Sequence, residues 1–200
     1  MSNTTTDSPK PLDVADWDSS LQFIIEDMNG LPLNVHKLMA HNPTLLAAWW
    51  NFRNYSVNGG TLGARLGELV ILRVGVSLNA WYEWASHVDR SLKCGLSLDE
   101  INSVLSKEIG AHWAADEASL LQAVDELLES QQISSATLAK LSSHFSNAQV
   151  MDIMAIHGMY IILGCMIKTW GLTLDPAVLE RIQNKASPEQ FASAAATFSR

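Results

Sequence analysis

Two residues that can move protons, Glu83 and His87, lie four positions apart in a stretch with the residue pattern of a helix. On a helix this spacing places both side chains on one face, one turn apart. A carboxylate beside an imidazole raises its basicity and can decide which ring nitrogen carries the proton. The pair is therefore a candidate proton-handling unit, and the alternative interpretation is an ion pair on a solvated helix face.

Three aromatic residues surround this pair, namely Trp81, Tyr82 and Trp84. Consecutive positions on a helix point in different directions, so the three rings cannot all face one pocket. Tyr82 and Trp84 are the candidates for an apolar wall that contacts a substrate. For each ring the alternative is packing in the protein core.

The amphipathic segment before the pair carries further charged residues. Glu68 lies near the edge of its apolar stripe and is predicted to act as a second acid or a proton relay. Arg53, Arg65 and Arg73 are the nearest sources of positive charge in the sequence. Arg65 or Arg73 is predicted to clamp a substrate carboxylate through two parallel hydrogen bonds. A surface ion pair between Arg65 and Glu68, worth little energy, is the alternative.

The composition narrows the class of protein. The chain has 200 residues, 48% of them apolar, which suits one domain with a sizeable core. Its formal charge of −8 argues against nucleic acid and anionic membrane surfaces as partners. The N-terminus is polar and lacks an apolar signal core, and the longest apolar run, 159–167, is shorter than the ~20 residues that span a bilayer. We therefore expect a cytoplasmic protein that acts on a small molecule.

The two cysteines, Cys94 and Cys165, form neither a CxxC motif nor a zinc-ligand spacing. Reduced thiols are the expectation, with a disulfide between them as the alternative. His157 lies in a long apolar segment and is expected to be a core histidine. A metal site formed by Glu83, His87 and His157 is an alternative from ligand type alone. No metal and no cofactor are expected.

The chain predicts an all-α fold because strand alternation and hairpin turns are missing. Residues 1–14 are predicted to be a disordered tail, 15–185 a single domain, and 186–200 a C-terminal tail that is weakly held or forms a short helix. Helices are expected over residues 17–29, 33–41, 43–57, 62–77, 79–94, 97–107, 115–130, 134–143, 146–170 and 176–184.

Three of these helices have readable start signals. Asn42 precedes a proline, and Asp175 repeats the same pattern, which places an N-cap before Pro in the first turn. Ser97 and Glu100 have the spacing of a capping box. The segment 146–170 is apolar throughout, which indicates the centre of a bundle or a subunit interface.

Three motifs in order resemble the carboxymuconolactone decarboxylase and alkylhydroperoxidase D (AhpD-like) superfamily. They are Gly67 to Val74, then Tyr82-Glu-Trp-Ala-Ser-His87, then Cys94 to Ile101. The resemblance covers roughly residues 35–175. It implies an all-α bundle around a central helical hairpin. It also implies an obligate homo-oligomer, commonly a trimer or hexamer.

The peroxidase branch of this superfamily carries a Glu, then a CxxC whose second Cys lies four residues before a His. These positions fall on Glu68, Ala80, Glu83 and His87, so both thiols are absent. Without a thiol that can ionise, the dithiol peroxidase reaction is disfavoured. The decarboxylase branch has Glu-x-x-x-His instead, which Glu83 and His87 match.

The resemblance and the residues together predict a cofactor-free lyase that acts on a small oxygenated acid or lactone. His87 would be the general acid or a hydrogen-bond donor to the enolate oxygen, and Glu83 would orient it. Glu68 would relay a proton. The alternative is a non-catalytic helical oligomer that binds a small hydrophobic ligand or a partner protein.

Overall fold

A computed structural model describes residues 8–198, which form helices and no strand. Two short 3-10 helices, Val14–Asp16 and Ser19–Leu21, come first. The α-helices are α1 (Gln22–Asp27), α2 (Asn34–Met39), α3 (Pro43–Val57), α4 (Ala64–Ser77), α5 (Trp81–Lys93), α6 (Leu98–Ser103), α7 (Ala115–Ser130), α8 (Ser135–Ser142), α9 (Asn147–Trp170), α10 (Pro176–Ile182) and α11 (Pro188–Ala195). The predicted all-α class is confirmed.

The start signals account for two of the helix starts. Asn42 accepts a hydrogen bond from the backbone N–H of Leu45 at the start of α3, at 3.1 Å. Ser97 and Glu100 form the reciprocal capping box of α6, with bonds of 3.1 and 2.7 Å. Each bond satisfies a backbone N–H that has no partner within its helix.

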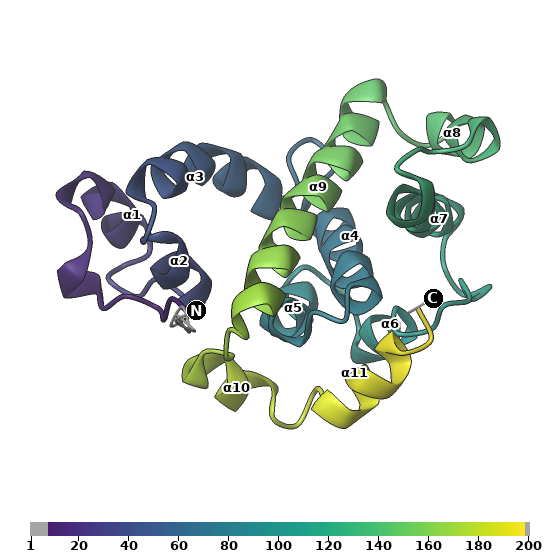
Figure 1. Cartoon of the computed structure of the whole chain (residues 1–200). Helices are drawn as coiled ribbons and strands as arrows, with labels where there is room; N and C mark the ends of the chain where they lie inside the picture. Colours follow the sequence, from purple (N-terminus) through teal and green to yellow (C-terminus); the bar gives the residue numbers. More distant parts are fainter. Residues whose placement is uncertain (1–7, 199–200) are drawn as a thin grey trace, which may run out of the picture.

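The centre of the molecule is α9, with α4 and α5 packed beside it (Figure 1). The two helices of the α4–α5 hairpin approach each other closely because Gly75 has no side chain. A Cβ there would lie 3.2 Å from the Cβ of Trp84, tighter than ordinary side-chain packing. Trp84 is 1% exposed, so the two helices share a dry interface.

The remaining helices lie on two flanks of α9 and at its lower end. In Figure 1, α1, α2 and α3 lie on one side of α9, and α7 and α8 lie on the other. α10 and α11 close the lower end, where both contact α5. In Figure 1, α5 lies beside the lower part of α9, above α10 and α11.

The C-terminal segment is a packed helix, which is one of the two forms predicted for it. Phe191 of α11 is 1% exposed and lies 5.4 Å, between ring centroids, from both Trp81 and Trp84. Near the other end, the backbone of Lys10 contacts the His41 ring, 2.7 Å from Nε2, and Leu12 N–H donates to the carbonyl of Lys37. The predicted disordered tail is thus wrong for residues 10–12, while residues 1–7 lie outside the described part.

α9 is the one helix of residues 8–198 whose length and composition would suit a membrane span, and half of its most apolar window is buried. The buried core helix of a soluble protein has the same properties. The apolar run counted from the sequence is shorter because it stops at His157 and Gly158 on one side and at Lys168 on the other, whereas α9 continues in both directions. The absence of a membrane partner stays a prediction.

Candidate active site

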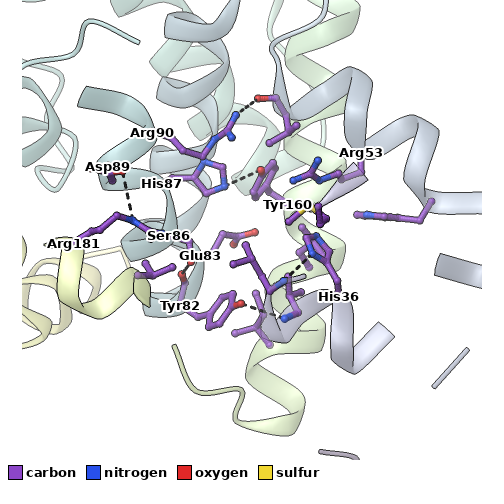
Figure 2. A pocket seen from close by; sticks show the side chains of 18 of the residues that line it. His36, Arg53, Tyr82, Glu83, Ser86, His87, Asp89, Arg90, Tyr160 and Arg181 are labelled. Atoms are coloured by element: carbon purple, nitrogen blue, oxygen red, sulfur yellow. Dashed lines mark hydrogen bonds and ion pairs between the residues drawn. The ribbon is translucent and has the colours of Figure 1, made fainter. Parts of the chain in front are cut away.

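A cavity of about 310 Å³ lies where α5 faces α9, between the α2–α3 flank and α10 (Figure 2). Glu83, His87 and Tyr160 lie on its inner side, and His36 and Arg53 lie opposite them (Figure 2). Trp49 also lines the cavity. Leu163 and Ile167 of α9 supply apolar surface. A cavity of this size accommodates a small organic molecule.

One face of α5 provides most of the polar lining. The residues of this face follow three- and four-residue spacing, as a single helix face requires: Tyr82, Glu83, Ser86, His87, Asp89, Arg90 and Lys93. Trp84 lies on the opposite face, stacked 6.0 Å from Trp81. The prediction that Trp84 contacts a substrate is therefore not supported, and its alternative, core packing, describes its surroundings.

His87 is held between two side chains. Its Nδ1 lies 2.7 Å from Oε2 of Glu68, and its Nε2 lies 2.9 Å from the hydroxyl of Tyr160. When Glu68 accepts from Nδ1–H of the neutral ring, Nε2 accepts a hydrogen bond from the Tyr160 hydroxyl. The prediction that Glu83 orients His87 is wrong: Glu68 has that position, because α4 packs directly against α5.

Glu68 is an ionised carboxylate at the end of this chain of bonds. Burial alone would raise its pKa, but His87 and Arg90 outweigh burial and the pKa is lowered. Nε of Arg90 donates to Oε1 at 3.0 Å, and the hydroxyl of Ser91 donates to Oε2 at 3.3 Å. The carboxylate is fully satisfied, so it can stabilise a positive charge on His87 without moving.

The chain from Glu68 through His87 to Tyr160 can pass a proton to the cavity. When His87 is protonated, its Nε2–H donates to the Tyr160 oxygen, and the hydroxyl hydrogen becomes free to bond elsewhere. Burial holds the pKa of Tyr160 well above its usual range, so the hydroxyl stays neutral. The relay therefore changes what Tyr160 offers, from an acceptor to a donor.

Glu83 is different from every other carboxyl of the site. It is 2% exposed, and neither of its oxygens has a hydrogen-bond partner. Burial raises its pKa well above the usual range, despite its place in the first turn of α5 where the helix dipole favours an anion. The side chain lies beside Gly164 of α9, where a Cβ would come within 3.3 Å of Oε2. Glu83 is thus a neutral carboxylic acid that borders the cavity.

Tyr82 lines the cavity, as predicted, and its hydroxyl is fully occupied. It donates to Oδ2 of Asp175 at 2.6 Å and accepts from the backbone N–H of Val35 at 3.2 Å. Asp175 was expected to cap α10, but it makes no such bond. Its carboxylate instead joins Tyr82 and the N–H of Asn34, and thereby ties α5, α2 and α10 together.

Arg65 and Arg73 do not reach the cavity, so the predicted substrate clamp is not supported for either. Arg65 pairs with Glu100 and Glu117, at 2.5 and 2.9 Å. Arg73 is 1% exposed, and its donors bond Asp125 and the backbone carbonyls of residues 104, 106 and 107. Both side chains connect α4 to the α6–α7 side of the molecule. Each lies away from the face of α5 that lines the cavity.

We expect Arg73→Lys to lower the free energy of unfolding by about 1.5–3 kcal/mol, because an ammonium group cannot replace the planar fork of donors. Arg65→Lys is the matched control, expected to cost under about 1 kcal/mol because Arg65 is partly solvated. Urea unfolding of both variants measures the difference. Equal losses would contradict the structural role of Arg73.

Sequence reasoning missed Trp49 and Tyr160, and it named Arg53 only as a nearby positive charge. Trp49 and Arg53 follow four-residue spacing on α3, but the sequence could not show that this face borders the cavity. Tyr160 was not selected because the segment that contains it is apolar and indicates core packing. Within residues 8–198 no group of three His, Cys, Asp or Glu could hold a metal ion, so the alternative metal site with His157 does not form.

Comparison with known proteins relates this chain to a family. Residues 43–126 match the model of the Carboxymuconolactone decarboxylase family. Over this stretch the chain is similar to the carboxymuconolactone decarboxylase and AhpD-like superfamily. Cys94 and Cys165 are both free, neither lines the cavity, and Ala80 and Glu83 stand where the peroxidase thiols would. The predicted resemblance to the branch without these thiols is thus confirmed.

Several solved structures share the fold of this chain. A variant of the debrominase Bmp8 in complex with 2,3,4-tribromopyrrole is 13% identical, with a TM-score of 0.73 over 89% of this chain and 97% of that one. An uncharacterised peroxidase-related protein from Ralstonia eutropha JMP134, with an alkylhydroperoxidase AhpD core, is 17% identical, with a TM-score of 0.74 over 86% and 94%. A protein of unknown function from Agrobacterium tumefaciens is 21% identical, with a TM-score of 0.63 over 68% and 94%. No curated protein matches the chain significantly.

Proposed function

We propose that this protein is a cofactor-free acid–base enzyme, a carboxy-lyase that acts on a small oxygenated acid or lactone. The observation that carries the proposal is Glu83, a buried and unpartnered carboxylic acid that borders the same cavity as the bonded chain of Glu68, His87 and Tyr160. An unpaired buried carboxyl costs stability, and such a cost is typical of a site that a substrate completes.

The reaction would use these groups in two steps. The bond to the departing carboxylate breaks, its electron pair passes into a neighbouring carbonyl to form an enolate, and carbon dioxide leaves. The hydroxyl of Tyr160, bonded to protonated His87, donates to the enolate oxygen. The electron pair then returns to carbon, which takes the proton of Glu83, and water reprotonates the resulting carboxylate after product leaves.

A dithiol peroxidase reaction has less support. Burial raises the pKa of Cys94, which lowers its thiolate fraction, and the thiol lies outside the cavity. Cys165 is exposed, far from Cys94 in sequence, and also outside the cavity. The positions that could hold a reactive pair at the cavity are Ala80 and Glu83, and neither can be oxidised.

The test is a search for turnover in heavy water. The purified protein is incubated with a panel of β-keto acids and carboxylated lactones, and NMR follows carbon dioxide loss and deuterium at the carbon that receives the proton. We expect at least one compound to lose carbon dioxide faster than in buffer. If compounds of the panel bind in the cavity and none of them reacts, the result would instead favour the binding-protein alternative.

We also propose that the chain assembles as a homo-oligomer, a trimer or hexamer, in the cytoplasm. The exposed apolar side chains include Met151, Met154 and Ile162 of α9, at 42–67%, and Phe52 and Tyr55 of α3, at 39% and 49%. Apolar patches of this kind support an association surface. Sedimentation equilibrium measures the mass, and a monomer at micromolar concentration would contradict the proposal. Ile162→Glu should lower the mass, whereas Leu138→Glu on α8 should leave it unchanged.

A further inference from the structure

The cavity collects cations in a chain whose formal charge is −8. Arg53, Arg90, Lys93 and Arg181 all line it, whereas Asp89 is the one acidic lining residue besides neutral Glu83. Four positive charges around one cavity produce a local positive potential that differs in sign from the net charge of the chain. The cavity is therefore suited to an anion even though the whole protein repels one.

Three of the four cations already have acidic partners. Arg90 is bonded to Glu68 at 3.0 Å. Lys93 and Arg181 share Asp89, at 2.7 and 3.7 Å, with Lys185 as a third partner at 3.2 Å. Each of these three cavity cations thus has a carboxylate within ion-pair distance.

Arg53 has no such partner among residues 8–198. Its Nη1 donates to the neutral amide of Asn54 at 2.7 Å, and its guanidinium lies 4.8 Å over the ring of Trp50. No carboxylate lies within ion-pair distance of it, although Asp27 interacts with it electrostatically at longer range, and its other donors have no protein acceptor among these residues. Figure 2 shows the guanidinium directed toward Tyr160, on the side of the cavity opposite α5. A charged fork of donors without acceptors is suited to a ligand oxygen.

A second unpartnered donor lies on the same face of α3. Trp49 precedes Arg53 by four residues, lines the same cavity and is 7% exposed. Its indole N–H is buried and has no hydrogen-bond acceptor. Leaving a donor dry and unpaired costs free energy, which a ligand acceptor would recover.

His36 on α2 adds a third donor to this wall. Its Nδ1 accepts from the backbone N–H of Leu33 at 3.3 Å. Burial lowers the pKa of His36 to about 3, so the ring is neutral and its proton is on Nε2. The α2–α3 wall thus offers N–H groups and one positive charge, and no carboxylate.

We propose that Arg53 and Trp49 form a subsite for a carboxylate group of the ligand. This inference rests on the proposed function, since it takes the cavity as the substrate site. It assigns the two walls different tasks: the α3 wall holds a charged end, and the α5–α9 wall handles protons.

The bound carboxylate is one that keeps its charge. A carboxylate that leaves as carbon dioxide loses its charge, so an arginine that held it would stabilise the ground state more than the transition state. The substrate class is therefore an acid with a carboxylate that survives the reaction, placed across the cavity from the reacting carbon. The apolar side chains of Leu163 and Ile167 would contact the part of the substrate between this carboxylate and the reacting carbon.

Binding of a matched pair of probes tests the subsite. The first probe is 5-oxotetrahydrofuran-2-carboxylate, which has no carbonyl positioned to accept electrons from decarboxylation and so remains intact. The second is its primary amide, equal in shape and neutral. We expect calorimetry to show that the carboxylate binds the wild-type protein roughly ten-fold to a hundred-fold more tightly than the amide.

Three variants locate the contact. Arg53→Gln should remove the preference for the carboxylate, Arg53→Lys should restore part of it, and Trp49→Phe should weaken carboxylate binding roughly three-fold to ten-fold. Arg181→Gln makes the same charge change at a cavity residue that is half-exposed and already paired with Asp89, and should alter binding by less than about two-fold. Melting temperatures check that each variant is folded.

The result that overturns the subsite is a carboxylate bound no more tightly than the amide, or a preference that Arg53→Gln and Arg181→Gln reduce equally. Either outcome leaves the acid–base proposal standing, because that proposal is judged by turnover. Conversely, carboxylate binding through Arg53 without turnover of any compound would retain the subsite and reject the lyase.

Discussion

His87→Gln is expected to lower kcat for any substrate of this protein by about 10²–10⁴-fold, the usual contribution of a positioned acid–base group. Glutamine has a size near that of histidine and can still bond the Tyr160 hydroxyl, but it cannot gain and release a proton. The variant keeps a polar group between Glu68 and Tyr160, so we expect it to fold. The measurement is kcat from initial rates of carbon dioxide release.

Ser86→Ala is the matched control for His87→Gln. Ser86 lies on the same face of α5 and lines the same cavity, but its hydroxyl donates only to the carbonyl of Tyr82, at 2.6 Å. We expect its kcat to remain within about two-fold of the wild-type value. If His87→Gln keeps full activity, the relay has no role in the chemistry and only the scaffold assignment remains.

The helices were predictable from local signals, because their caps and apolar spacing lie within one segment. The start of α3 at Asn42 and the capping box of Ser97 and Glu100 are examples. Asp175 was misread for the opposite reason. Its sequence neighbourhood is that of an N-cap, but Tyr82 and Asn34, far away in sequence, provide its partners. Local patterns cannot show a competition that tertiary contacts decide.

The site was predicted in part because two of its residues share one helix face. Spacing placed Glu83 and His87 together on α5, and the structure has both at the cavity. Spacing could not show that Glu68 is the partner of His87, since that contact depends on how α4 packs against α5. The same limit explains why Arg65 and Arg73 were selected and Arg53 was not: the direction of an arginine is set by the neighbouring helices.

Glu83→Gln is expected to make the protein more stable and less active, with a stability gain that grows with pH. Burial raises the folded-state pKa of Glu83 above that of the unfolded chain, about 4.3 for a free glutamate. Between these two pKa values the folded state binds a proton that the unfolded state has released. The free energy of unfolding of the wild type therefore falls as pH rises, by up to about 1.4 kcal/mol per pH unit from this one group.

Glutamine cannot titrate, so the difference in unfolding free energy between Glu83→Gln and the wild type should widen from pH 5 upward. It should level off once the pH passes the folded-state pKa. Urea unfolding at pH 5, 6, 7 and 8 measures this difference. Glu108→Gln makes the same chemical change at an exposed position, and its difference from the wild type should stay constant.

Glu83→Gln is also expected to lower activity, because an amide cannot deliver a proton to carbon. We expect turnover to fall by at least about 10²-fold at every pH where the variant is more stable than the wild type. A gain in stability together with a loss of turnover would mean that the buried acid is maintained for chemistry, at the expense of the fold. A difference that does not change with pH would mean that Glu83 titrates normally, and a neutral proton donor could then no longer be assigned to the cavity.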